Sequence, residues 1–158
     1  MFGQMKSLNV ETKILNPLIG KAIPLPSYAT EGSAGIDLRA CLKEPISIQP
    51  GETVLIGSGI AINIKDPNIV GIIVPRSGLG IKNGIVLANT IGVIDSDYQG
   101  EIKIGLFNRS RIQYTVKPGE RICQMMFIPV INATLKLVQG FSNATDRGTG
   151  GFGHTGKE

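Results

Sequence analysis

Short apolar runs separated by turn-forming residues dominate this sequence and restrict the folds open to it. The runs at residues 46–48, 53–56, 59–64 and 69–74 are rich in isoleucine and valine, and turns containing glycine or proline lie between them. β-Branched residues favour strands, whereas glycine and proline favour tight turns. We find no amphipathic helix pattern of any length, although residues 77–80 could form a single helical turn. The sequence therefore predicts an all-β domain.

Composition supports one domain that associates with copies of itself. A chain of 158 residues can bury one substantial core. Hydrophobic residues make up 42% of it and charged residues only 18%, so we expect part of the apolar surface to lie between subunits. We predict a barrel domain over residues 1–138, which ends in a short strand at 135–138. A mobile glycine-rich arm is predicted over residues 139–158, where no periodic apolar face is present.

The charge pattern disfavours nucleic acid as a partner, and the hydrophobicity pattern disfavours a membrane. The net charge is +4 and the basic residues are scattered, whereas nucleic-acid surfaces usually cluster them with aromatic residues. No apolar run is long enough to span a bilayer, and the N-terminus lacks the pattern of a secretion signal. Cys41 and Cys123 show no metal-ligand spacing and are expected to be reduced thiols. The sequence predicts a cytoplasmic protein with a small anionic ligand.

The stretch at residues 83–105 concentrates polar groups between two apolar runs. The runs at 91–94 and 102–104 are predicted to form a hairpin, strand, turn and strand. Asp95 and Tyr98 lie in its turn. The pKa of a carboxylate at the end of a buried strand can be tuned by burial, and an aromatic ring can wall a flat ligand. Alternatively, the same residues only satisfy the turn backbone and fill the edge of the core.

A second group of polar residues follows the buried run at 69–74. Arg76, Ser77 and Gly78 bring a guanidinium, a hydroxyl and a backbone amide, all of which can donate hydrogen bonds to phosphate. An ordinary turn is the alternative interpretation of this tripeptide.

Gln124 is a polar residue within the apolar strand predicted at residues 121–131. Strict alternation places Arg121 and Cys123 on one face of that strand and Gln124 on the other. An amide among apolar neighbours needs a hydrogen-bonding partner, which either core backbone or a ligand can supply.

The C-terminal residues 147–158 combine glycines with Arg147 and Phe152, groups suited to phosphate contacts and to ring stacking. Two phosphate-loop patterns are matched only in part, because no strand precedes this segment and no helix can follow it. A disordered glycine-rich terminus is the alternative interpretation.

Composition also restricts metal and histidine chemistry. His154 is the only histidine, so a single chain cannot build a Ser-His-Asp triad or a multi-histidine zinc site. Magnesium instead takes oxygen ligands and retains water molecules. Asp37 could hold such waters, or it could pair with Arg39 or with a turn amide.

Five separated motifs together resemble the trimeric dUTP pyrophosphatases (dUTPases), in the order found in that family. The motifs are AGIDLRA at 34–40, PRSGLG at 75–80, GVIDSDYQG at 92–100, GERICQ at 119–124 and RGTGGFGHTG at 147–156. The motifs resemble most those of bacterial members, and the resemblance covers the chain from residue 8 onward. Gly80 and His154 depart from the commonest pattern, in which alanine and serine are frequent at these positions.

The resemblance implies a distorted jelly-roll β-barrel, assembled as a homotrimer whose three active sites each draw on three chains. It also implies Mg²⁺-assisted hydrolysis of dUTP to dUMP and pyrophosphate, which supplies dUMP for dTMP synthesis and keeps uracil out of DNA. A dCTP deaminase shares this fold, but the extra helical sequence and the glutamate base expected of it are not found. A dUTP-gated switch that binds a protein partner is a further alternative.

The resemblance assigns roles to individual residues. Asp95 is the expected general base for in-line attack of water on the α-phosphate, Gln124 helps to place that water, and Asp37 reaches magnesium through water. Tyr98 would pack under the deoxyribose and exclude a ribose 2′-hydroxyl. The arm of one chain would close over a neighbour's site as a lid. The residues implied to bind substrate are Arg76, Ser77, Gly78, Asn89, Val93, Ile94, Asp95, Tyr98, Lys103, Gln124, Arg147, Phe152, Gly153 and Thr155.

Overall fold

The computed structural model describes residues 7–151, which contain ten strands and one short helix. In chain order they are β1 (Glu11–Ile14), β2 (Ile36–Arg39), β3 (Ile46–Ile48), β4 (Thr53–Asn63), β5 (Ile69–Pro75), α1 (Ser77–Asn83), β6 (Ile85–Leu87), β7 (Gly92–Ile94), β8 (Glu101–Asn108), β9 (Tyr114–Val116) and β10 (Arg121–Pro129). The predicted all-β class is confirmed. Within these residues no helix has the length and hydrophobicity needed to cross a membrane.

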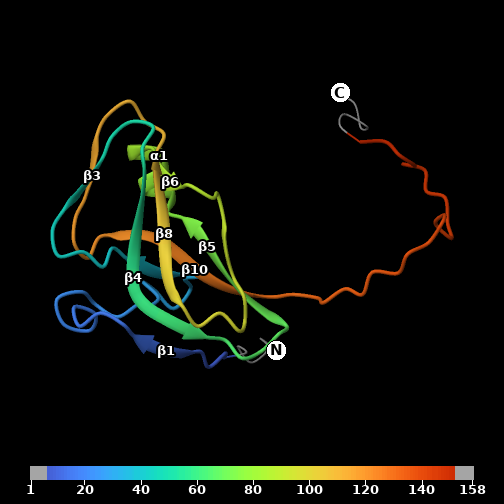
Figure 1. The fold of residues 1–158 in the computed structure, drawn as a ribbon, viewed down its shortest axis with the longest axis horizontal. Coiled ribbons are helices and arrows are strands. Elements are labelled where there is room, and N and C mark those ends of the chain that lie inside the picture. Colours follow the sequence, from blue (N-terminus) through green and yellow to red (C-terminus); the bar gives the residue numbers. More distant parts are fainter. Residues whose placement is uncertain (1–6, 152–158) are drawn as a thin grey trace.

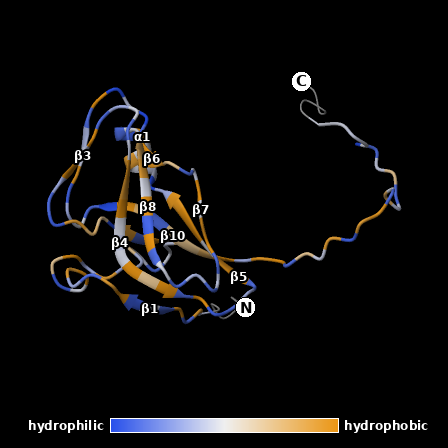
Figure 2. Ribbon diagram, in the orientation of Figure 1, coloured by the Kyte–Doolittle hydropathy of each residue, from blue (hydrophilic) through white to orange (hydrophobic). Residues whose placement is uncertain are grey.

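Two four-stranded antiparallel sheets form a distorted jelly-roll barrel around one core (Figure 1). The first sheet has the order β1-β4-β8-β6 and the second has the order β2-β10-β5-β7, while β3 and β9 pair as a two-stranded ribbon. Isoleucine dominates the core, to which both sheets contribute side chains such as Ile60, Ile73 and Ile104. Strand β5 is hydrophobic almost throughout (Figure 2), as its continuous apolar run predicts for a buried strand.

Strand β4 merges the two strands predicted at residues 53–56 and 59–64. Its pairing with β8 is irregular between Gly57 and Ala61, and the strand curves across the barrel (Figure 1). Gly59 has a φ of +74°, and a Cβ atom there would lie 2.7 Å from the sulfur of Cys41. Glycine at this position therefore allows one curved strand instead of two.

The hairpin predicted over residues 83–105 is wrong in its pairing. Strand β7 pairs with β5, with Val93 opposite Ile72, whereas β8 pairs with β4 and β6 in the other sheet. Residues 95–100 therefore connect two sheets and do not form the tip of a hairpin. Both runs are apolar enough to be strands, but their partners are chosen by residues distant in the sequence.

A β-bulge in β10 makes the predicted strict alternation of this strand wrong. Arg121 pairs with Arg39 of β2, but Cys123 pairs with Leu38, so Ile122 is one extra residue on the β10 side. Ile122 and Cys123 are 1% and 0% exposed, and both belong to the core. Arg121 consequently leaves the face of Cys123 and is exposed.

After β10 the chain leaves the barrel as an extended arm (Figure 1), and the strand predicted at residues 135–138 is not found among the described residues. Side chains of residues 131–149 are all exposed, with Ile131 at 95%, Leu135 at 89% and Leu137 at 98%. A strand needs a neighbouring strand to satisfy its backbone groups, and the described part of this protomer offers none along the arm.

Asn108, at the end of β8, is a fully buried polar residue. Its amide nitrogen donates to the carbonyls of Ile48 (2.9 Å) and Ile112 (2.8 Å). Its amide oxygen accepts from the N–H (2.9 Å) and the hydroxyl (2.7 Å) of Ser110. One side chain therefore joins the end of β8 to β3 and to the loop that follows β8.

Replacing Asn108 with alanine is expected to lower the free energy of unfolding by about 2–4 kcal/mol, because two carbonyls and one N–H group lose a buried partner. Denaturant titration at a fixed protein concentration measures the loss. Asn9→Ala, at an exposed position, is the control and is expected to change stability by less than about 0.5 kcal/mol. Equal stability of Asn108→Ala and the unaltered protein would contradict the structural role of this network.

Candidate active site

Neighbouring strands bring three of the predicted site residues together at one end of the second sheet. Gln124 on β10 lies opposite both Asp37 on β2 and Val74 on β5. Residues directly opposite each other in an antiparallel pair project to the same face of the sheet. Arg76 follows β5 immediately, and its Nε forms an ion pair with Asp37 Oδ1 at 3.0 Å. We call Asp37, Arg76 and Gln124 the Asp37 cluster.

Asp37 is shared between two arginines. Its second oxygen, Oδ2, accepts from Arg121 Nη1 at 3.1 Å, and its side chain is only 16% exposed. Arg39, one of the partners considered from the sequence, donates instead to the carbonyl of Gly119 at 2.8 Å. Arg121 was missed as a neighbour of the site because strict alternation put it on the wrong face, although its place in the GERICQ motif was a signal.

Close packing orients Gln124. Its Nε2 donates to the carbonyl of Pro75 at 3.3 Å. Gly35 lies against the same side chain, and a Cβ atom at this position would be 2.8 Å from Oε1 and 3.2 Å from Cβ of Gln124. The glycine is therefore required for Gln124 to occupy this place.

Ser77 and Gly78 begin α1 and present free donors beside the Asp37 cluster. Arg76 is the N-cap residue, in an extended conformation, and no side chain caps the helix. The Gly80 N–H donates to the Arg76 carbonyl at 2.9 Å, so the N–H groups of Ser77 and Gly78 precede the helical hydrogen bonds. Both residues are exposed. Together with Arg76 they can bind an oxyanion such as phosphate.

Asp95 follows β7 directly and is exposed. Two backbone bonds hold its turn: the Tyr98 N–H donates to the Asp95 carbonyl at 3.1 Å, and the Lys65 N–H donates to the Ser96 carbonyl at 3.2 Å. Lys65 has a φ of 67°, which is uncommon for a residue other than glycine. Asp95 and Val93 line an open hollow of about 670 Å³. An exposed carboxylate at a hollow can accept a proton from a bound water molecule.

Tyr98 is held against Gly100. Its hydroxyl donates to the carbonyl of Glu101 at 3.0 Å. A Cβ atom at Gly100 would lie 2.5 Å from the hydroxyl oxygen, so only glycine leaves room for the ring. Tyr98 is 44% exposed, and part of its ring therefore remains open to a ligand.

The other residues predicted near Asp95 lie on β7, on β8 and in the turn before β7. Asn89 is exposed in that turn. Val93 is 61% exposed, whereas Ile94 packs against the core and offers only its backbone outward. Lys103 is exposed on β8, in the other sheet. The predicted group around Asp95 thus spans the edges of both sheets.

One protomer keeps the Asp95 turn and the Asp37 cluster apart. The residue before Asp95 lies opposite Gly71 of β5, whereas Gln124 lies opposite Val74. The two groups are therefore offset by about four residues along the strand direction, or roughly 13 Å. The structure does not bring all the predicted site residues together within a single chain.

The arm carries the last predicted site residues. Arg147 is exposed, and its Nε donates to the carbonyl of Gly150 at 2.9 Å within the arm itself. The arm extends away from the barrel (Figure 1). Phe152, Gly153 and Thr155 lie outside the described residues.

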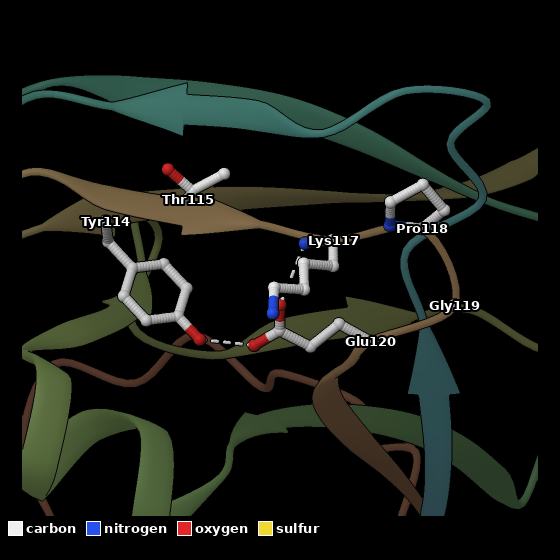
Figure 3. Close-up of a pocket in the computed structure, with 6 residues that line it drawn as sticks. All are labelled: Tyr114, Thr115, Lys117, Pro118, Gly119 and Glu120. Atoms are coloured by element: carbon white, nitrogen blue, oxygen red, sulfur yellow. Dashed lines mark hydrogen bonds between the residues drawn. The ribbon is translucent and has the colours of Figure 1, made fainter.

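A second hollow, of about 570 Å³, lies beside the turn that precedes β10 (Figure 3). Its lining residues are Tyr114, Thr115, Lys117, Pro118, Gly119 and Glu120, none of which was predicted in the site. The Tyr114 hydroxyl donates to the Glu120 carboxylate, which also accepts from the Lys117 N–H at 2.9 Å. Burial, and then the bond to Glu120, raises the pKa of Tyr114. This network fixes the turn that leads into β10.

The described residues contain no group of three or more histidine, cysteine, aspartate or glutamate side chains placed to bind a metal ion. A metal ion at this site would therefore take most of its ligands from a substrate and from water. Asp37 fits an outer role, because each of its oxygens keeps a free lone pair beside its arginine bond. The residues fit a magnesium ion held through water and not one bound directly by several carboxylates.

Fold and site together define a class, namely an all-β barrel protein with groups able to bind an oxyanion and a separate exposed carboxylate suited to acid-base chemistry. The dUTPase family model matches residues 21–156. The deoxyuridine 5′-triphosphate nucleotidohydrolase of Idiomarina loihiensis is 58% identical over 148 residues, which cover 94% of this chain and 97% of that protein. The Escherichia coli K12 (DH10B) protein of the same name is 54% identical over 149 residues, which cover 94% and 98%. The chain belongs to the dUTPase family.

Solved structures share the fold. A mutant dUTPase of phage 80α superposes with a TM-score of 0.80 at 24% identity, covering 94% of this chain and 99% of that chain. The dUTPase of the Staphylococcus bacteriophage 80α with dUPNHPP has a TM-score of 0.77 at 25% identity and covers 95% and 99%. A mutant dUTPase of S. aureus phage φ11, described with a structural Mg(II) ion, has a TM-score of 0.74 at 20% identity and covers 85% and 99%.

Both cysteines are free thiols, as predicted, and Cys123 adjoins the site residue Gln124. Cys123 is fully buried. Burial, and then the charge of Asp37, raises the pKa of Cys123 to about 12, while the charge of Arg76 acts in the opposite direction.

Cys123 is expected to resist alkylation by iodoacetamide at pH 9 in the folded protein. The thiolate is the reactive form, and a thiol with a pKa of about 12 stays protonated at this pH. Mass spectrometry of the Cys123 peptide over time measures the rate, and the same residue in protein unfolded with guanidinium is the control. Similar rates in the two states would contradict the expectation.

Proposed function

We propose that this protein hydrolyses dUTP to dUMP and pyrophosphate. Family membership supports the substrate, and the observation that carries the chemistry is the exposed Asp95 carboxylate at the hollow beside β7. Asp95 acts as the general base and takes a proton from a water molecule that attacks the α-phosphate. Pyrophosphate leaves on the opposite side of the phosphorus. The product dUMP feeds dTMP synthesis, and removal of dUTP keeps uracil out of DNA.

Selection of base and sugar is assigned to the strands around Asp95. The outward backbone from Val93 to Asp95, with Asn89 and the backbone near Lys103, reads the edge of uracil. Tyr98 lies under the deoxyribose, where a ribose 2′-hydroxyl would collide with its ring. A contact with one methyl group is worth only about 1–3 kcal/mol, so exclusion of thymine must be largely steric.

The triphosphate is assigned to the Asp37 cluster and the start of α1. Arg76, Ser77 and Gly78 offer a guanidinium, a hydroxyl and backbone N–H groups within three consecutive residues. Gln124 is held by Gly35 and by the strand register, which suits it to place the attacking water. Donors held in place, such as the N–H groups at the start of α1, stabilise the charge that develops in the transition state.

Magnesium is assigned an outer contact with Asp37 through water, with most of its ligands supplied by the phosphates of the substrate. When bound, it would offset the charge on the phosphates. The chain's own part is to orient the Asp37 carboxylate, which its contacts with Arg76 and Arg121 support.

The complete site is shared between copies of the chain. The Asp95 turn and the Asp37 cluster are offset by roughly 13 Å along the strand direction of one sheet. Ile72, Val93 and Met126 project to the sheet face between them, and Val93 is 61% exposed. A second copy packed on this face would bury the apolar strip and bring one copy's Asp37 cluster to the other's Asp95. Three such contacts in a closed ring give a homotrimer with three complete sites.

Residues 139–158 are assigned to an arm that closes over a neighbour's site, and residues 1–138 to the barrel domain. Exposed apolar side chains in the extended segment between β10 and residue 139, such as Leu137 at 98%, support a neighbour as the packing surface. Arg147, Gly153 and Thr155 would contact the phosphates, and Phe152 would stack on uracil. Both cysteines are free, which suits the reducing cytoplasm as the protein's location.

A dUTP-gated switch that binds a protein partner is the second candidate. The phage 80α structure is described in terms of phage dUTPases that control transfer of virulence genes by a G protein-like mechanism, a property of those proteins. Both candidates require dUTP binding, but only the first requires Asp95 as a base. The family match disfavours the dCTP deaminase alternative.

Asp95→Asn is expected to slow pyrophosphate release from dUTP by about 100- to 10,000-fold, because an amide cannot accept the proton. Affinity for dUPNHPP should stay within about threefold, since the substrate contacts remain. Asp97→Asn, in the same turn, is the matched control and should retain the rate. Release from dTTP, dCTP and UTP, measured in parallel, should be far slower. Turnover by Asp95→Asn would refute the assigned base, and binding of dUTP without turnover by the unaltered protein would favour the switch.

Two inactive variants are expected to regain activity when they are mixed and allowed to exchange subunits. Asp95→Asn lacks the base, and a chain ending at residue 146 lacks Arg147 and the residues after it. In mixed trimers an intact Asp95 of one copy meets an intact arm of another, and roughly a quarter of the sites are restored at equal mixing. Light scattering is expected to give three copies per particle. Mixed trimers without any activity would show that base and arm come from the same chain.

A further inference from the structure

Arg121 contacts two members of the Asp37 cluster but has no role in the reaction proposed above. Its Nη1 donates to Asp37 Oδ2 at 3.1 Å, and its backbone carbonyl accepts from Arg76 Nη1 at 3.4 Å. The bulge at Ile122 places Arg121 there, because both Ile122 and Cys123 point into the core. A bulge beside a site commonly re-aims one side chain, and here that side chain is Arg121.

Two nitrogens of the Arg76 guanidinium already contact other groups of the protein. Its Nε forms an ion pair with Asp37, its Nη1 donates to the Arg121 carbonyl, and its side chain is 30% exposed. A phosphate chain that binds Arg76 must therefore compete with Asp37. Asp37 is only 16% exposed, so losing all its partners would leave a poorly solvated charge.

Arg121 prevents Asp37 from becoming an unpaired charge, because it contacts Oδ2 whereas Arg76 contacts Oδ1. With Arg121 in place, Asp37 remains paired when Arg76 turns away. Without Arg121, Arg76 would be the sole cationic partner of Asp37 in this cluster as the structure describes it, and Asp37 would retain it more firmly.

We infer that Arg121 is a positioning residue that keeps Asp37 paired while Arg76 turns from Asp37 to the outer phosphates of the nucleotide. Arg121 acts through Asp37 and does not touch the substrate. This inference rests on the proposed function and deepens it, because it identifies how the free site prepares Arg76 for a triphosphate.

The test compares the affinities of variants for dUPNHPP and for dUMP by calorimetry without added metal. Arg121→Gln is expected to bind dUPNHPP about tenfold more weakly, because Asp37 then retains Arg76. Binding of dUMP, which lacks the outer phosphates, should stay within about twofold. Arg121→Lys, which keeps the charge, should recover part of the lost affinity.

A second substitution separates this role from direct phosphate binding. In Asp37→Asn the charge that retains Arg76 is gone, so adding Arg121→Gln should cause no further loss of dUPNHPP affinity. A loss that persists in the Asp37→Asn background would mean that Arg121 binds phosphate itself and would overturn the inference.

Arg39→Gln is the matched control. Arg39 lies opposite Arg121 in the β2–β10 pair but donates to the Gly119 carbonyl, so its loss should leave both affinities within about twofold. An unchanged dUPNHPP affinity in Arg121→Gln, or an equal loss for both ligands, would overturn the inference. Failure of the unaltered protein to bind dUPNHPP would instead refute the proposed function.

Discussion

The pairing of β10 with two partners is the constraint on which the site depends. β10 lies between β2 and β5, so a single residue, Gln124, faces Asp37 on one side and Val74 on the other. A slip of one residue would turn every side chain of β10 to the opposite face. At the bulge the pairing register shifts by one residue. Ile122 and Cys123 therefore both point into the core, and Arg121 points outward.

Several glycines of the sequence motifs are explained by close packing. A Cβ atom at Gly35 would meet Gln124, one at Gly100 would meet Tyr98, and one at Gly92 would lie 2.9 Å from Cβ of Ile73. In each case the missing side chain lets a strand or a polar group approach closely. These glycines determine where neighbouring side chains lie, which is a more specific role than flexibility.

The outer face of the second sheet carries polar groups at both ends and apolar side chains between them. Val93 on this face and Leu137 on the arm are largely exposed in the protomer. Burial of such surface drives association, so the proposed assembly would use the same surface that completes the proposed site. Stability of the assembly and completion of the site would then be coupled, since both require the same contact between copies.

The sequence by itself determined the all-β class, the positions of most strands and turns, and the chemical groups in the motifs, because these follow from local propensity and residue type. Only the tertiary structure decided that β7 joins β5 instead of β8, and that Arg121 and not Arg39 pairs with Asp37. It also decided that Asp95 lies far from Gln124 within one protomer. Strand partners, bulges and register depend on packing between residues distant in the chain, which local patterns do not encode.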